Sequence, residues 1–284
     1  MEMNAFFEYY EQKTGLTIGI REKLFDKQTP YQRVEVFDTD AWGHLLTIDG
    51  MVMLSEKDEF VYHEMISHVP LFLHPAPKRV LVIGGGDGGT VREVLKHRVV
   101  EHVDLVEIDE AVVEASKLHF PGLGVFEHPK LTVTIGDGIG YMAGLENAVD
   151  VIIVDGSDPT GPAEGLFSES FFRNCERALR LGGVLVAQNE SPWVPSYRPA
   201  IRAVMRTLEE QFAFANLYLS FIPLYPAGMW GMALASKGPD PLQGARAERL
   251  AEDGDFLGSL RYYNPEVHRG AFALPNFVRE MVGG

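Results

Sequence analysis

A glycine-rich segment between an apolar run and a helical pattern is the feature that most constrains how this chain folds. Residues 79–83 are a short apolar run, and the segment Gly84–Gly89 follows it directly. Glycines let the backbone come close to a ligand, and the N–H groups at the start of a helix are free to bind it. Glu107 ends the next predicted strand, about 20 residues on, where a carboxylate can bind two ribose hydroxyls. The spacing predicts a ligand that contains a nucleoside, and it fits NAD as well as S-adenosylmethionine.

Asp87 lies inside this glycine segment and narrows the choice of ligand. A carboxylate at this position would repel a pyrophosphate, whereas it would attract an ammonium group. This disfavours an NAD-dependent enzyme. The structural alternative is a glycine turn in which Asp87 is the N-cap of the following helix.

Strand-like runs and helical patterns alternate through the middle of the chain. Strands are expected over residues 79–83, 102–109, 131–135, 149–154 and 183–187, and helices over residues 60–66, 91–97 and 111–119. The first of these helices is expected to stop near Pro70 and Pro75. Because the strands are apolar on both faces, they predict a parallel sheet covered by helices, which is a doubly wound α/β domain. Residues 237–255 are expected to form a polar connection before the last helix.

The first part of the chain has a different pattern. Residues 17–20 alternate as in a strand, and further strands are expected over residues 31–37, 43–48 and 51–54, with a hairpin turn at Asp49-Gly50. This pattern predicts a small antiparallel β domain. We therefore expect an N-terminal β-strand domain over residues 1–58 and a larger α/β domain over residues 59–284.

Four carboxylates follow or end predicted strands of the larger domain. They are Asp87, Glu107, Asp137 and Asp155. Ligands of open α/β sheets bind at the carboxyl ends of the strands, so these side chains should line one mouth of the sheet. Carboxylates this close are costly unless they meet cations or hydrogen-bond donors. The alternative for residues 155–162 is an Asx-type turn with prolines.

Two common catalytic patterns are absent near these carboxylates. His63 and His68 are five residues apart, so they miss the His-Glu-x-x-His spacing of zinc enzymes and lie on different helix faces. No Gly-x-Ser-x-Gly elbow surrounds Ser157. We expect no metal site.

The net charge and the cysteine content limit which classes of partner and which cellular compartment we expect. The net charge of −15 at pH 7 argues against nucleic-acid binding, which needs a basic face. An acidic surface attracts cations, although many proteins are acidic only for solubility. The single cysteine, Cys175, fits a reducing cytoplasm. The chain opens with acidic rather than basic residues, and no apolar run approaches the roughly 20 residues of a membrane helix. We expect a cytoplasmic protein with no membrane and no nucleic-acid partner.

Several sequence blocks, in the same order, resemble the spermidine synthase family. They are Asp49-Gly50 with Ser55–Glu64, the segment Gly84–Gly89, Val106–Asp109, Gly136–Gly138, Asp155–Phe167, and Tyr262–Asn264 with Val267–Arg269. The resemblance extends over nearly the whole chain. It implies a small N-terminal β domain and a Rossmann-like catalytic domain with the doubly wound sheet of class I methyltransferases. It also implies a homodimer or homotetramer.

The resemblance implies an aminopropyltransferase. Such an enzyme moves the aminopropyl group of decarboxylated S-adenosylmethionine, a co-substrate rather than a bound cofactor, onto putrescine, and so forms spermidine and methylthioadenosine. Residues implied to bind the donor are Gln32, Gly84, Gly86, Asp87, Glu107, Asp137, Gly138 and Pro162. Residues implied to bind the amines are Tyr62, His63, Asp87, Asp155, Asp158, Gln188 and Tyr225. Asp155 is implied as the catalytic base, assisted by the hydroxyl of Tyr62. We expect burial and neighbouring carboxylates to raise the pKa of Asp155.

The amine end of the implied channel departs from the family pattern. Leu224 replaces the usual residue between Pro223 and Tyr225, and Met229 and Trp230 lie where smaller or polar residues are common. These differences leave agmatine, cadaverine or spermidine open as acceptors. Trp193 and Trp230 fit core packing equally well.

Two further alternatives stay open. One is a methyltransferase of the same fold that acts on an amine. The other is a catalytically silent paralogue, which would be expected to lack Asp155 or Tyr62, although both residues are present.

Overall fold

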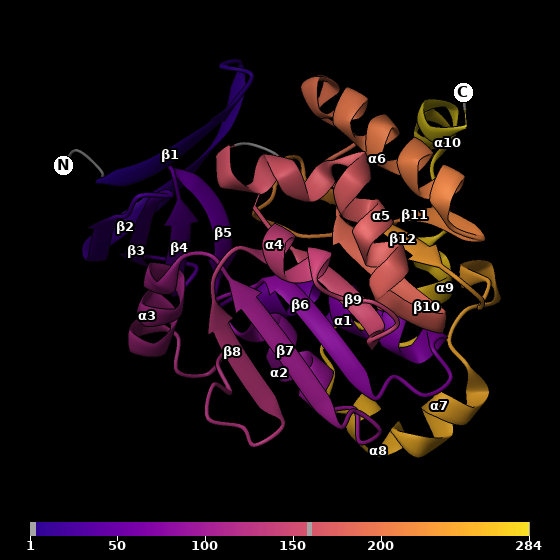
Figure 1. The fold of residues 1–284 in the computed structure, drawn as a ribbon. Coiled ribbons are helices and arrows are strands. Elements are labelled where there is room, and N and C mark those ends of the chain that lie inside the picture. The colour runs from indigo at the N-terminus through magenta and orange to yellow at the C-terminus, as the bar shows by residue number, and fades with distance from the viewer. Residues whose placement is uncertain (1–3, 158–160, 284) are drawn as a thin grey trace.

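The small N-terminal sheet comes first along the chain. The computed structural model describes residues 4–157 and 161–283. Strands β1 (Ala5–Tyr10), β2 (Thr14–Gln28), β3 (Arg33–Thr39), β4 (His44–Ile48) and β5 (Met51–Ser55) pair in that order, each antiparallel to the next. Figure 1 shows this sheet in indigo at the upper left of the molecule. The expected hairpin turn is confirmed, because Asp49 and Gly50 join β4 to β5 with φ values of 50° and 77°, as a type I′ turn requires. The sequence pattern did not predict β1.

The larger sheet has seven strands in the order β11-β12-β10-β9-β6-β7-β8. Strands β6 (Arg79–Gly84), β7 (His102–Glu107), β8 (Leu131–Ile135), β9 (Val149–Asp155) and β10 (Leu179–Gln188) are parallel, as expected. Strands β11 (Phe214–Phe221) and β12 (Met229–Ser236) form an antiparallel pair that joins β10 at the edge. The sheet is therefore mixed rather than wholly parallel.

Helices cover both faces of this sheet. Along β6, the side chains of Val80 and Val82 pack with those of α1 (Glu59–Leu73) and α2 (Gly89–Leu95). The alternate side chains, Leu81 and Ile83, pack on the other face with α5 (Glu169–Ala178) and α6 (Arg198–Gln211). This period-two division of apolar residues is what a doubly wound sheet requires. Helix α4 (Gly138–Ala143) packs against α5, on the face seen in front of the sheet in Figure 1.

The first helix ends near the two prolines, as expected, although it includes one of them. Helix α1 runs through Pro70 and ends at Leu73, two residues before Pro75. A proline inside a helix costs about 3 kcal/mol. The three residues that follow, Leu71, Phe72 and Leu73, are at most 1% exposed, and burial of each large apolar side chain contributes about 1.5–3 kcal/mol. Tertiary packing therefore outweighs the local signal.

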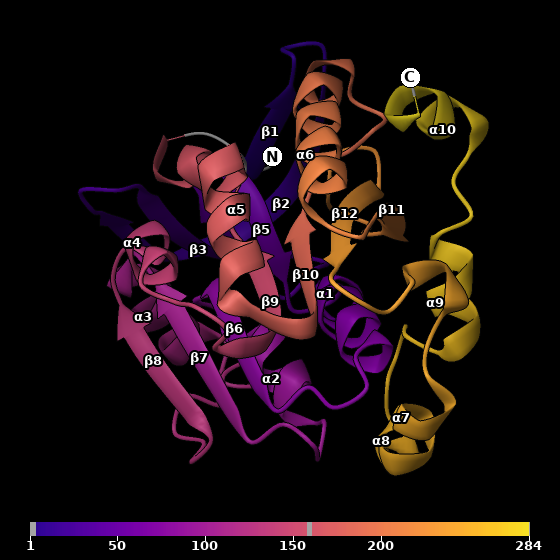
Figure 2. The same ribbon diagram turned by 45° about the vertical axis from the view of Figure 1, so that its right-hand side comes forward.

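The expected polar connection over residues 237–255 contains helical segments. They are a 3₁₀ turn (Pro241–Gln243), α7 (Ala247–Glu252) and the start of α8 (Gly254–Leu257), and two more helices follow, α9 (Pro265–Ala271) and α10 (Asn276–Val282). Figure 2 shows α7 to α10 along the side of the molecule on which β11 lies. Arg249 on α7 is fully buried and lies 2.7 Å from a carboxyl oxygen of Asp253. This polar segment therefore contains a buried ion pair between Arg249 and Asp253.

The two sheets are joined by packed side chains. Helix α3 (Glu110–His119) contributes Ala111, Val112 and Ala115 to one core with residues of β3, β4 and β5. Leu224, in the loop between β11 and β12, packs with Phe37 and Leu45 of the small sheet. These contacts hold the two sheets against each other, and residues of both sheets line the space between them.

Candidate active site

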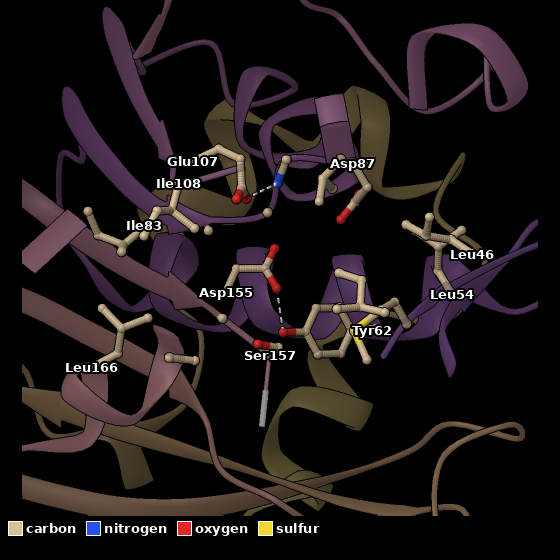
Figure 3. A pocket seen from close by; sticks show the side chains of 18 of the residues that line it. Leu46, Leu54, Tyr62, Ile83, Asp87, Glu107, Ile108, Asp155, Ser157 and Leu166 are labelled. Atoms are coloured by element: carbon tan, nitrogen blue, oxygen red, sulfur yellow. Dashed lines mark hydrogen bonds between the residues drawn. The ribbon is translucent and has the colours of Figure 1, made fainter. Parts of the chain in front are cut away.

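A cavity of about 1060 Å³, open to solvent, lies at the carboxyl ends of β6, β7 and β9. Its walls include most of the side chains predicted from the sequence, namely Gln32, Tyr62, His63, Gly84, Gly86, Asp87, Glu107, Asp137, Gly138, Asp155 and Tyr225. Figure 3 shows Asp87, Glu107, Asp155 and Tyr62 facing this space, with Leu46 and Leu54 of the small sheet at its right-hand side in this view. The four carboxylates do share one mouth of the sheet, as the strand positions predicted.

The glycine segment lets two backbones and a carboxylate meet. Gly84 has a φ of +79°, and a Cβ atom added to it would lie 2.2 Å from the backbone carbonyl oxygen of Asp155. A Cβ atom added to Gly86 would lie 2.8 Å from Oε2 of Glu107. No side chain larger than hydrogen fits at either position without displacing a residue of the site.

Glu107 is held by backbone donors on both oxygens. The N–H of Gly86 donates to Oε2 at 3.1 Å, and the N–H of Asp109 donates to Oε1 at 2.9 Å. Burial raises the pKa of Glu107 to about 7, although these two hydrogen bonds oppose the rise. The carboxylate is therefore fixed in place at the mouth of the glycine segment.

Asp155 carries two hydroxyl donors. The hydroxyl of Tyr62 donates to Oδ1 at 2.5 Å, and the hydroxyl of Thr90 donates to Oδ2 at 2.6 Å. Burial is the main cause of a raised pKa of Asp155, and the negative charge of Asp87 adds to it. The expected direction is confirmed. A carboxylate with a raised pKa and a fixed orientation is suited to accept a proton from a bound group. The sequence did not single out Thr90, although it follows the glycine segment directly.

Asp87 faces Asp155 in an opposite electrostatic setting. Its Oδ1 accepts a hydrogen bond from the N–H of Gly89 at 2.7 Å and lies 3.1 Å from Nε2 of His63. Burial alone would raise the pKa of Asp87, but the charge of His63 and these hydrogen bonds lower it. The N-cap of α2 is Gly88, so the contact with Gly89 is local while the carboxylate still faces the cavity.

His63 is a charged residue with two carboxylate partners. Its Nδ1 lies 2.6 Å from Oε2 of Glu59, on the side opposite Asp87. Burial would lower the pKa of His63, yet Asp87 and Glu59 raise it to about 10. Sequence reasoning implied a channel-lining role for His63 and did not single out Glu59, because their pairing depends on the helix register of α1.

The structure does bring together a group of side chains with metal-ligand character. One ligand atom from each of His63, Asp87 and Asp155 lies within 4.8 Å of the others. Spacing along the sequence did not predict this group, since its members come from α1, the glycine segment and β9. An imidazolium has no lone pair to offer a metal, and His63 is held in that charged form.

A smaller cavity of about 390 Å³ adjoins the first and shares Tyr62, Ser157 and Tyr225 with it. Gln188 and Trp230 line it, and the side chain of Gln188 donates to the backbone carbonyl of Ser157 at 3.1 Å. Trp230 is 4% exposed, so it serves both as a packed residue and as a wall.

Two other positions at this end were expected to matter and are not among the lining residues. Leu224 packs into the small sheet, and Met229 packs against the core on one face of the large sheet. Trp193 is 57% exposed and rests on the ring of Phe277, so it is neither a core residue nor a wall of these cavities. Asp158 lies outside the described residues, and so does the side chain of Pro162.

The fold and the site define a Rossmann-like enzyme whose ligand cavity is acidic and is closed on one side by a small β-sheet. In residues 4–157 and 161–283, no helix is both long and apolar enough to cross a bilayer.

Comparison with known proteins identifies the family. The model described as spermidine synthase tetramerisation domain matches residues 5–56, and the model described as spermine/spermidine synthase domain matches residues 59–242. The chain therefore belongs to the spermine/spermidine synthase family, and it is an aminopropyltransferase.

Individual relatives support this assignment over the full length. Polyamine aminopropyltransferases of Bacillus cytotoxicus and Bacillus subtilis are each 43% identical to this chain; the alignments cover 98% and 96% of it, and 98% of each relative. The structure of spermidine synthase from Thermotoga maritima has a TM-score of 0.93 and 40% identity, covering 100% of this chain and 95% of that one. A spermidine synthase in complex with the transition-state analogue AdoDATO has a TM-score of 0.93 and 41% identity, covering 98% and 94%.

Proposed function

We propose that this enzyme is a spermidine synthase, which transfers the aminopropyl group of decarboxylated S-adenosylmethionine to putrescine. The observation that carries the proposal is the pair of facing aspartates. Asp155 has a raised pKa and two hydroxyl donors, whereas Asp87 is kept ionised beside His63. One carboxylate suits proton acceptance and the other suits an ammonium group, within one cavity.

In this proposal the donor lies along the glycine segment. Glu107 binds the ribose hydroxyls, and Gln32, Asp137 and Gly138 surround the thioadenosyl group together with Pro162. Gly84 and Gly86 allow its close approach. Asp87 binds the ammonium of the aminopropyl chain. Ordinary S-adenosylmethionine carries a carboxylate next to this amine, which would meet Asp87 with like charge at a cost of several kcal/mol. This repulsion selects the decarboxylated donor.

The acceptor lies toward the smaller cavity, where Tyr62, Gln188 and Tyr225 contact it, and Asp158, which lies outside the described residues, is proposed as a further amine ligand on the family resemblance alone. Asp155 accepts a proton from the attacking amine. The nitrogen lone pair then forms a bond to the methylene next to the sulfonium. The carbon–sulfur bond breaks, and its electron pair stays on sulfur, which leaves as neutral methylthioadenosine. Alignment of bound reactants can contribute about 7–11 kcal/mol, and a positioned base typically adds about 10²–10⁴-fold.

A panel of acceptors tests the proposal. The purified protein is supplied with decarboxylated S-adenosylmethionine and with putrescine, cadaverine, agmatine or spermidine, and methylthioadenosine release is measured with the mass of the product. We expect the highest kcat/KM with putrescine. A higher value with another amine would change the acceptor and point to Trp230. If a folded protein that binds the donor released nothing with any amine, the proposed reaction would be wrong.

Oligomerisation belongs to the same proposal. The small sheet exposes Phe7 and Tyr9 on one face of β1, 53% and 68% exposed, with their rings stacked. The family model over this sheet is described as a tetramerisation domain. We propose a cytoplasmic homo-oligomer that assembles through β1, and light scattering of a Phe7→Glu/Tyr9→Glu variant should then show a smaller particle than the wild type.

A further inference from the structure

Four charged side chains form a line that ends on Asp87. Arg92 on α2 donates to both carboxylate oxygens of Glu59, at 3.2 and 2.8 Å. Glu59 Oε2 lies 2.6 Å from Nδ1 of His63, and His63 Nε2 lies 3.1 Å from Oδ1 of Asp87. Positive and negative groups alternate along the line. All four side chains are less than one-fifth exposed.

The geometry fixes the protonation of His63. Each ring nitrogen faces a carboxylate oxygen, and a neutral imidazole would turn the lone pair of one nitrogen toward a negative oxygen. Both nitrogens therefore carry hydrogen, and the ring is an imidazolium. The ring is also packed tightly, since a Cβ atom added to Gly89 would lie 2.3 to 2.6 Å from three of its atoms. The backbone of Gly89 therefore lies close against one side of the ring.

The line touches one of the two facing aspartates and not the other. The imidazolium contacts Asp87, while among the described residues the side-chain donors to Asp155 are the neutral hydroxyls of Tyr62 and Thr90. Two carboxylates this close would otherwise compete for one proton. The groups that face His63 and Asp87 from the packed elements are Glu59 and Tyr62 on α1, Arg92 on α2, Glu107 on β7 and Asp155 on β9.

We propose that Glu59 is a positioning residue that assigns the roles of the two aspartates. By holding His63 charged against Asp87, it keeps Asp87 as the anionic partner of the donor's ammonium and leaves Asp155 as the base. Both contacts of Asp87 fall on Oδ1, so Oδ2 is the oxygen presented to the ammonium. This inference rests on the proposed function, because it takes Asp87 as the ammonium ligand.

A conservative variant separates this role from a structural one. Glu59→Gln keeps the size of the side chain, and its amide can donate to Nδ1 of a neutral His63, which still donates from Nε2 to Asp87. The variant therefore removes one of the two carboxylates that raise the pKa of His63, and it keeps the contact with the ring while losing the hydrogen bond from Arg92 Nη2. His63 then loses its proton at a lower pH, and Asp87, with less positive charge beside it, has a higher pKa than in the wild type. The control is Glu64→Gln on the same helix, because buried Glu64 accepts hydrogen bonds from the backbone of residues 261–263 and is not among the lining residues of either cavity.

Calorimetric titration between pH 4 and 9 with two ligands gives the test. Decarboxylated S-adenosylmethionine carries the ammonium, and methylthioadenosine lacks it. For Glu59→Gln we expect unchanged binding of methylthioadenosine. We expect donor affinity to fall about tenfold for each pH unit below the raised pKa of Asp87 and to recover toward the wild type at pH 9. The wild type and Glu64→Gln should show no such recovery.

Each contrary result has a distinct meaning. Equal loss of both ligands at every pH would make Glu59 a purely structural residue, and an unaltered pH dependence of donor binding would also overturn the inference. If the wild type bound the donor no better than methylthioadenosine, the assignment of Asp87 and with it the proposed function would fail instead. NMR of the wild-type imidazoles needs no variant: His63 must remain charged at pH 8, and a neutral ring would refute the role of Glu59.

Discussion

At the scale of single residues, the site depends on which atom receives each hydrogen bond. Asp155 and Asp87 are the same residue type in the same cavity, yet hydroxyl donors surround one and an imidazolium contacts the other. Strand position predicted that the two would meet. Sequence could not predict their different settings, because Thr90, Glu59 and Arg92 reach them through contacts between α1, α2 and the sheet.

Thr90 should tune the base. Its buried hydroxyl stabilises the ionised form of Asp155, so Thr90→Val should raise the pKa of Asp155 further. The acid limb of the kcat profile should then move to higher pH by about one unit or more, since a hydrogen bond to a charged group contributes about 1.5–3 kcal/mol. Thr90→Ser, which keeps the donor, should retain the wild-type profile. Coincident profiles for the valine variant and the wild type would contradict this role.

Asp87 should control donor selection. Asp87→Asn removes the charge that attracts the ammonium and repels the carboxylate of ordinary S-adenosylmethionine. We expect the affinity for the decarboxylated donor to fall by about 10- to 100-fold, while the affinity for S-adenosylmethionine falls less or rises. Competition binding of the two compounds measures the ratio. Methylthioadenosine serves as the control ligand, and a ratio equal to that of the wild type would show that charge does not select the donor.

At the scale of elements, the carboxyl edge of the parallel strands was the predictable part. Apolar runs and the glycine segment identified β6, β7, β8 and β9 and placed the carboxylates after them. Strands β11 and β12 were missed. Residues 229–236 are buried almost throughout, and a short run without alternation does not distinguish a strand from a buried helix. Helix α1 ends at Leu73, close to the expected stop, although packing carries it through Pro70.

The turn from β6 into the glycine segment should tolerate no side chain. Gly84→Ala places a residue at a φ of +79° and a Cβ atom 2.2 Å from the carbonyl of Asp155, so it should lower the free energy of unfolding by at least about 2 kcal/mol. The shift of Asp155 should also abolish most activity. Gly270→Ala in α9 is the matched control, because nothing lies within 4 Å of its added Cβ atom, and it should be neutral or stabilising by up to about 1 kcal/mol. Urea unfolding and methylthioadenosine release distinguish the two variants.

At the scale of the whole molecule, the ligand cavity is completed only where the small sheet meets the large one. Gln32, Leu46 and Met53 reach the cavity from the small sheet, and the hydroxyl of Tyr225 donates to the backbone carbonyl of Met53 at 2.6 Å. Sequence patterns predicted both sheets, but their relative placement depends on side chains such as Leu224, which gave no signal of an inter-sheet contact. The repulsion among the carboxylates of this cavity is offset by the buried cations His63 and Arg92. Because His63 loses its charge as the pH rises, the stability of the protein depends on pH.

His63 should dominate that dependence on the alkaline side. Its pKa is about 10 in the folded protein and about 6.5 in the unfolded chain, so the folded state binds more protons between these values. The stabilising contribution is complete below pH 6.5 and is lost as the pH rises toward 10. Glu107, with a pKa of about 7, is mostly ionised above pH 7.5 and contributes little to the change beyond it. From pH 7.5 to 9.5, the free energy of unfolding of the ligand-free protein should therefore fall by on the order of 1 kcal/mol per pH unit.

Glu59→Gln isolates this contribution. Because the pKa of His63 is lower in the folded variant, the variant should be less stable than the wild type at pH 7.5 and should lose less stability up to pH 9.5, so that the two curves converge. Burial raises the pKa of the Cys175 thiol, which adds a loss of stability above about pH 8.5 that both proteins share. Urea unfolding at several pH values measures both slopes, with Glu64→Gln as the control that keeps the wild-type slope. Parallel curves for Glu59→Gln and the wild type would mean that Glu59 does not raise the pKa of His63. Convergence would show that the residue that assigns charge in the cavity also sets how the whole fold responds to pH.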